Sequence, residues 1–132
     1  MNEAEVKEKF INDWSDTLKD LLGESLRLYC IEFPVRTNDG QKYADLVYEL
    51  DENSIPMKNK MMIVELKRGM IDTGAVEQVL RYSHFTKLQL YRKQKITSFI
   101  AGTGFSDWEI KMCRDNKVFP LQFDYNGNMR IL

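Results

Sequence analysis

Three charged residues lie in two segments whose other residues are mostly apolar. Residues 44–50 contain Asp45, and residues 61–67 contain Glu65 and Lys67. Because alternate residues of a β-strand share a face, Glu65 and Lys67 project the same way and their apolar neighbours point to the opposite side. If the two segments pair as a hairpin, Asp45 approaches the same place from the adjacent strand. Two carboxylates and an ammonium would there form a metal site with a helper cation.

Carboxylate oxygens are the ligands of hard divalent cations. Mg²⁺ keeps several waters and is usually held by one or two carboxylates together with phosphate oxygens of a substrate. Asp45 and Glu65 meet that demand, with the backbone carbonyl of Leu66 as a third ligand, and the residues do not distinguish Mg²⁺ from Mn²⁺. The cation would acidify a water into a nucleophile, while Lys67 would orient that water or neutralise charge at phosphorus. These residues therefore predict hydrolysis of a phosphodiester.

This pattern resembles the PD-(D/E)xK nuclease superfamily, whose motif is an acidic residue at a strand end, followed by Asp or Glu, any residue and Lys on the next strand. Here the motif reads Asp45 and Glu65-Leu66-Lys67. Ala44 replaces the proline of the family's name, which carries no catalytic atom. Residues 72–82 look like the helix that follows in this superfamily, and the resemblance implies that Gln78 joins the catalytic set.

Within the superfamily, residues 65–69 together with residues 75–82 are similar to the C-terminal catalytic domain of archaeal and bacterial mismatch- and branched-DNA endonucleases, and to related viral and CRISPR-associated nuclease domains. The resemblance covers roughly residue 26 to the C-terminus. It implies an α/β, restriction-endonuclease-like core of order αβββαβαβ(β), with a central mixed sheet flanked by helices. It also implies DNA as substrate and a homodimer that cuts both strands. Mismatch specificity is not implied, because the additional N-terminal DNA-binding domain of those enzymes has no room here.

Further residues are candidates for supporting roles. In the branch that this chain resembles, an acidic residue upstream of the first strand often sits near the site, and Glu32 is the matching candidate for metal binding or water positioning. Arg68 and Arg81 are the candidates for phosphate contacts, and Tyr82 either touches the substrate or packs against its own helix. The net charge is -1, so any phosphate-binding patch depends on the distribution of charge rather than on its sum. A second group of basic residues comprises Lys87, Arg92, Lys93 and Lys95.

The composition is that of a small folded domain. The chain has 132 residues, 43% of them hydrophobic, which predicts a single nuclease domain over residues 1–132. It has no apolar run of the roughly 20 residues that span a bilayer, and its acidic start is unlike a signal peptide, so we expect a cytoplasmic protein, in the host cytoplasm if it is viral. Cys30 and Cys113 form no CxxC pair, which predicts reduced thiols and no zinc site. The lone histidine, His84, is expected to be structural.

The expected elements follow from hydrophobic periodicity. Apolar residues at helical spacing predict one amphipathic helix over residues 2–22, and Phe10, Trp14 and Trp108 are expected in the core or at an interface. Residues 26–34 and the segments around Asp45 and Glu65 predict a three-strand meander, with residues 51–60 as a polar connection. A helix from residue 72 or 73 to about 93 leads to a strand at 96–101, which predicts a parallel crossover. A short helix from 106 or 107 and strands at 118–125 and 129–132 complete the order. Gly102-Thr103-Gly104 is expected to be a strand-end turn and not a phosphate-binding loop, because it lacks the lysine and the spacing.

The leading functional hypothesis is a divalent-metal-dependent DNA endonuclease in phage or prokaryotic DNA processing, repair or defence. One alternative is a nucleic-acid-binding or regulatory module of the same fold. Another is a catalytic domain that needs a protein partner to supply its specificity, and that is RNA-directed or ligand-activated. The sequence leaves the number of metals and the preferred nucleic-acid structure open.

Overall fold

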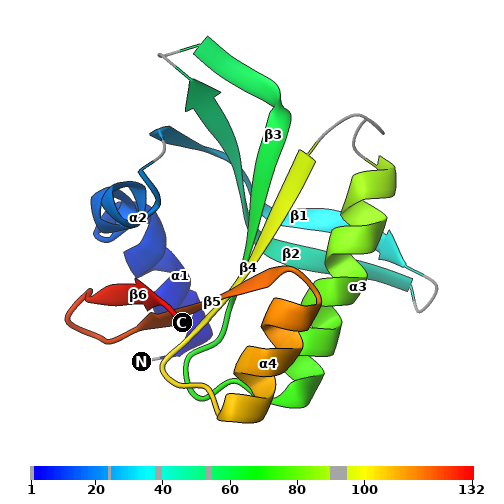
Figure 1. Ribbon diagram of the computed structural model, residues 1–132. Coiled ribbons are helices and arrows are strands. Elements are labelled where there is room, and N and C mark those ends of the chain that lie inside the picture. Colours follow the sequence, from blue (N-terminus) through cyan, green and yellow to red (C-terminus); the bar gives the residue numbers. More distant parts are fainter. Residues whose placement is uncertain (1, 24, 38–39, 53–54, 90–94) are drawn as a thin grey trace.

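A single six-stranded sheet organises the chain in the computed structural model, which describes residues 2–23, 25–37, 40–52, 55–89 and 95–132 (Figure 1). The strands lie in chain order, with β3–β4 and β4–β5 parallel and the other neighbours antiparallel. The predicted parallel crossover is therefore confirmed. The strands are β1 (Ser25–Thr37), β2 (Gly40–Glu52), β3 (Ile55–Leu66), β4 (Lys95–Gly102), β5 (Val118–Phe123) and β6 (Met129–Ile131).

Helices cover the two faces of this sheet. The helices are α1 (Glu3–Asn12), α2 (Ser15–Leu22), α3 (Thr73–Gln89) and α4 (Asp107–Asp115). Figure 1 shows α1 and α2 on one side of the strands and α3 and α4 on the other. Along β4 the side chains alternate between the two cores, since Phe99 and Ala101 pack on the α1–α2 side and Ile100 packs under α3 and α4. The predicted mixed sheet flanked by helices is confirmed.

The larger core lies under α1 and α2 and is built around three aromatic rings. Phe10 meets Trp14 and Phe123 edge to face, with ring centroids 5.4 Å apart in both pairs. These contacts join the N-terminal helices to β5, close to the C-terminal end of the chain. Phe10 and Trp14 are buried, as the sequence predicted. Edge-to-face packing of this kind adds about 0.5–1.5 kcal/mol per pair to the gain from burial, so the rings fix α1 against the sheet.

The prediction of one helix over residues 2–22 is wrong, because the helix is interrupted between α1 and α2. Trp14 has non-helical backbone angles, with φ -108° and ψ 4°. The Ser15 hydroxyl donates hydrogen bonds to the carbonyls of Phe10 and Ile11, at 2.9 and 2.7 Å. A side chain thus satisfies acceptors at the end of α1, which removes the cost of ending the helix there. Hydrophobic periodicity continues across the break, so it could not reveal it.

The prediction that residues 51–60 form a polar connection is also wrong. β2 and β3 pair as far as Glu52–Ile55, so most of that segment belongs to a long hairpin whose residues 53–54 lie outside the described part. Within the described ranges, pairing with β4 begins at Lys60–Lys95. The first residues of β3 therefore pair with β2 and not with the described part of β4. Backbone hydrogen bonds stabilise this part of the hairpin, although its sequence lacks the apolar pattern that would predict a strand.

One apolar side chain lies outside the core, which excludes the first of the two places expected for it and leaves the interface as a prediction. Trp108, expected in the core or at an interface, is 62% exposed near the start of α4. Cys113 is a buried free thiol. The side chains of Cys30 and His84 lie outside the described part of the structure. None of the described helices is long and apolar enough to cross a membrane.

Candidate active site

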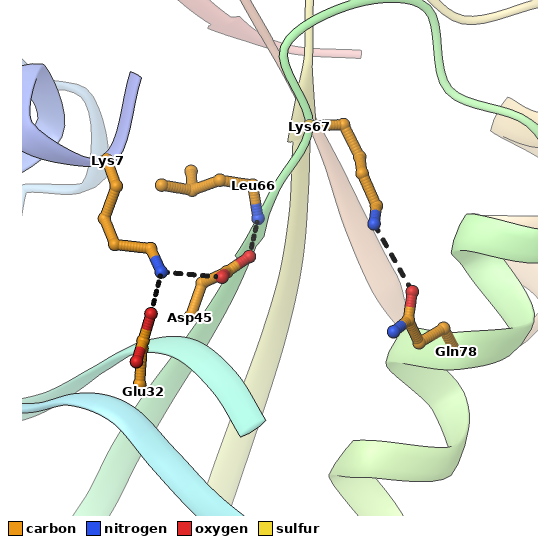
Figure 2. A network of polar contacts seen from close by, with 6 residues as sticks. All are labelled: Lys7, Glu32, Asp45, Leu66, Lys67 and Gln78. Atoms are coloured by element: carbon orange, nitrogen blue, oxygen red, sulfur yellow. Dashed lines mark hydrogen bonds and ion pairs between the residues drawn. The ribbon is translucent and has the colours of Figure 1, made fainter. Parts of the chain in front are cut away.

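The candidate site lies where β2 and β3 separate. Their pairing ends at Leu46–Val64. Asp45, which precedes Leu46, and Glu65, which follows Val64, are the first residues beyond the last pair. Beyond this point the Leu66 backbone N–H donates to Asp45 Oδ2 at 2.8 Å, so the aspartate side chain takes the place of a strand neighbour (Figure 2). On its other edge β3 stays paired with β4 to its end. The fork thus brings Asp45 beside the last residues of β3, as the hairpin hypothesis requires.

Glu65 is a buried carboxylate next to a second carboxylate. Its side chain faces away from the α1–α2 core, which takes Val64 and Leu66 instead, and the residue is only 4% exposed. Burial, and then the charge and hydrogen bonding of Asp45, raise the pKa of Glu65 from its ordinary 4.5 to about 9, while the charge of Lys67 opposes the shift. Two acidic groups held this close in a buried place favour a proton or a cation between them.

One oxygen of this pair fits a bound cation. Among the buried polar atoms of the described residues, Glu65 Oε2 lacks a hydrogen-bond partner, and such an atom is costly unless a ligand satisfies it. In a β-strand the N–H and C=O of one residue point to the same edge, so the Leu66 carbonyl opens toward the edge where its N–H meets Asp45. Asp45, Glu65 and this carbonyl together supply the oxygen ligands that a hard divalent cation takes. No cluster of three metal-ligating side chains occurs among the described residues, so the backbone oxygen matters.

Lys67 and Gln78, both expected in the catalytic set, lie together next to this pair. The Lys67 Nζ donates to Gln78 Oε1 at 3.4 Å, from the end of β3 to the second turn of α3 (Figure 2). Both side chains line an open cavity of about 540 Å³. Glu3, at the start of α1, lines the same cavity, and sequence reasoning missed it because acidic residues in a first helical turn are ordinary.

The loop that follows Lys67 is held against the end of β4. The Lys67 N–H donates to the Ala101 carbonyl at 2.9 Å, and the Thr103 N–H donates to the Gly69 carbonyl at 3.0 Å. A Cβ atom at Gly102 would lie 2.8 Å from that same Gly69 carbonyl, so only glycine permits this approach. The prediction that β4 ends at Gly102-Thr103-Gly104 is confirmed. The small size of Gly102 keeps the Lys67 loop close to the sheet.

The proposed nucleic-acid contacts are only partly described. Arg68 is exposed and lines the cavity with Lys67, and its carbonyl accepts a hydrogen bond from the Tyr125 hydroxyl. Arg81 is exposed on α3, three residues beyond Gln78 and so on a neighbouring part of the helix surface. The side chain of Tyr82 lies outside the described part of the structure. The same holds for the side chains of the second basic group, residues 87, 92, 93 and 95.

Glu32 is linked to Asp45 through a lysine. Lys7, on α1, places its Nζ 3.0 Å from Asp45 Oδ1 and 3.2 Å from Glu32 Oε1 (Figure 2). Burial lowers the pKa of Lys7, but hydrogen bonds and charge from Asp45 and Glu32 outweigh it, so the pKa is raised above 10.5. Sequence reasoning missed Lys7. Its only signal is a position next to buried Val6, at the border of the apolar stripe.

Comparison with solved structures finds the same fold in two of them. A repair endonuclease from Pyrococcus abyssi superposes with a TM-score of 0.69 at 18% sequence identity, over 94% of this chain and 47% of that one. A structure of an EndoMS–dsDNA complex gives a TM-score of 0.67 at 13% identity, over 92% of this chain and 44% of that one. This chain thus spans about half the length of these proteins. Neither a family profile nor a curated protein matches its sequence.

Proposed function

We propose that this chain, whose fold is shared by about half of each of these endonuclease structures, is a divalent-metal-dependent nuclease that hydrolyses DNA phosphodiester bonds. One observation carries the proposal: a buried Glu65 with an unpartnered oxygen stands beside Asp45, at the same strand end as Lys67. A structural ion pair would pair its charges with each other, whereas this arrangement leaves an oxygen for a ligand. The neighbours' descriptions as a repair endonuclease and a DNA complex favour DNA as the substrate.

Each residue then has a distinct task. Asp45, Glu65 and the Leu66 carbonyl would hold Mg²⁺ or Mn²⁺, which when bound supplies Lewis acidity toward a water and a phosphate oxygen. Lys67 places its ammonium to orient that water or to neutralise charge that develops on the phosphate. Gln78 holds Lys67 through its amide oxygen, which fixes the direction of the ammonium group. Arg68 and Arg81 would contact backbone phosphates, which position the substrate without reading its sequence.

A cleavage panel tests this function. Linear, nicked, flapped, branched and single-stranded DNA, and matching RNA, are incubated with the protein in Mg²⁺, in Mn²⁺ or in excess chelator. We expect DNA cleavage in either metal and none with chelator, because both carboxylates need a cation to act on a phosphodiester. Binding without cleavage of any substrate would instead favour a nucleic-acid-binding module of this fold. Activity that appears only with an added protein would favour a catalytic domain that depends on a partner.

The proposed nuclease acts as a homodimer. One site cuts one strand at a time, so cleavage of both strands at one place is simplest with two sites related by symmetry. Phe10 and Trp14 do not supply the dimer surface, because both side chains are buried within the chain. The mass of one chain is 15.6 kDa, and size-exclusion chromatography with light scattering is expected to give twice that mass at high concentration. A monomer at every concentration, with and without duplex DNA, would contradict this prediction.

A further inference from the structure

Lys7 holds the carboxylate of Asp45 from the side opposite to the strand backbone. Asp45 Oδ2 accepts from the Leu66 N–H at 2.8 Å, and Asp45 Oδ1 lies 3.0 Å from Lys7 Nζ. Each carboxylate oxygen has a partner, so the orientation of Asp45 is fixed from two directions (Figure 2). Each oxygen also keeps further lone-pair capacity. A cation can therefore still bind Asp45 while Lys7 stays in place.

The position of Lys7 is itself fixed from two sides. Val6, the preceding residue, is fully buried in the core, which anchors this turn of α1 on the sheet. The Lys7 side chain is only 16% exposed, whereas that of Glu32 is 64% exposed. Lys7 therefore has a largely buried side chain, with one partner of its ammonium toward the site and one toward solvent.

Glu32 reaches this lysine through an unusual backbone conformation. The β1–β2 register pairs Ile31 with Leu46 and Phe33 with Ala44, which places Glu32 opposite Asp45. The φ angle of Glu32 is +52°, in the left-handed region that non-glycine residues rarely adopt. A conformation of this kind costs on the order of 1–3 kcal/mol and persists only where the surroundings enforce it. Here the residue with this conformation is the second partner of the Lys7 ammonium, beside Asp45.

We propose that Lys7 is a positioning residue that sets how tightly the Asp45–Glu65 pair binds a divalent cation, and that Glu32 tempers its effect. This inference rests on the proposed function. Lys7 orients Asp45, but its positive charge repels a cation bound to the same carboxylate. Glu32 lies on the far side of the ammonium, and its negative charge offsets that repulsion. The two members of one ion pair therefore act on metal affinity in opposite directions.

Substitutions separate these effects. Lys7→Met keeps the length of the side chain and removes its charge, and we expect it to bind Mn²⁺ about tenfold more tightly, since one unit charge near the cation is lost. Glu32→Gln leaves Lys7 uncompensated, and we expect Mn²⁺ binding to weaken, by about threefold because Glu32 is farther away and exposed. Lys7→Arg keeps the charge and should restore an affinity close to that of the wild type. Lys9→Met removes a charge from the same helix at an exposed pair with Asp13, and it serves as the matched control.

Each purified protein is titrated with Mn²⁺ alone, and the concentration of free Mn²⁺ is measured by electron paramagnetic resonance. Circular dichroism verifies that each variant is folded. Opposite shifts for Lys7→Met and Glu32→Gln support the inference, because merely structural damage would weaken binding in both. Unchanged affinity in both variants, or weaker binding in both, overturns it while leaving the nuclease proposal intact. Absence of Mn²⁺ binding by the wild type, together with absence of cleavage, overturns the inference and the proposed function.

Discussion

Glu65→Gln is expected to reduce DNA cleavage on the order of a thousandfold or more, to the limit of detection, while the protein stays folded. The amide keeps the shape of the side chain but loses the negative charge that would hold the cation. It also presents an NH₂ group in place of one carboxylate oxygen, at a position where Glu65 Oε2 lacks a protein partner. Cleavage of the preferred substrate in saturating Mg²⁺ is the measurement. Activity within tenfold of the wild type would exclude Glu65 as a ligand.

The same substitution is expected to stabilise the metal-free protein above neutral pH. The pKa of Glu65 is raised from 4.5 to about 9 on folding, chiefly by burial. The folded state therefore holds its proton more tightly than the unfolded state, so this group favours folding fully below pH 4.5 and loses that contribution as the pH rises toward 9. Glutamine does not titrate, so the variant should lack this decline. Chemical denaturation between pH 5 and 9 in chelator measures the difference.

Glu49→Gln is a matched control for both effects. Glu49 is also buried in the sheet, on β2, but its carboxylate pairs with Arg27. Glutamine keeps an oxygen that can accept from Arg27 but loses the negative charge of the ion pair, so this variant should be less stable than the wild type. Its cleavage should persist, because Glu49 lies on β2 paired with Met61, several residues from the strand fork. Two substitutions of the same kind would thus change stability in opposite directions.

Lys67→Met is expected to lower the cleavage rate about a hundredfold, with Mn²⁺ affinity retained or increased. Lys67 Nζ bonds to Gln78 and its charge acts on Glu65, but it supplies no oxygen ligand. Removal of the ammonium therefore takes away its effect on the water and on the phosphate, and leaves the ligands in place. A loss of rate with intact metal binding distinguishes Lys67 from Asp45 and Glu65.

Single-turnover cleavage and the Mn²⁺ titration together measure this difference. Lys111→Met is the control, because Lys111 lies on α4 in an exposed ion pair with Asp115. We expect that variant to cleave at the wild-type rate. A Lys67→Met protein that also binds Mn²⁺ many times more weakly would contradict the assigned role and would place Lys67 in the support of the metal ligands.

The sequence predicted the features that depend on alternation along a strand. Asp45, Glu65 and Lys67 stood out because charges interrupted apolar strands, and the structure brings the two carboxylates together as the hairpin hypothesis required. The parallel crossover followed from the length of the helical segment between two strands. The catalytic roles of these residues remain predictions until the variants are measured.

Features that depend on side-chain contacts between distant segments could not be predicted. The break before α2 depends on the Ser15 hydroxyl, which any helical pattern tolerates. Lys7 joins the site only because α1 packs with Val6 and Phe10 on the sheet, and a lysine beside an apolar stripe is ordinary on any amphipathic helix. Glu32 was expected near the metal, but it contacts Lys7 and has a positive φ angle, and its residue type signals neither feature.

The strand fork makes the chemistry of this fold modular. The proposed ligands, the lysine and its glutamine partner all lie between Asp45 and Gln78, in one β2–β3–α3 unit. The remaining strands and helices support that unit and surround it. The surfaces around the cavity, such as that of Arg68, can therefore change without moving a proposed ligand. In the proposed nuclease, the residues that would carry the reaction and those that would select the substrate are therefore different side chains.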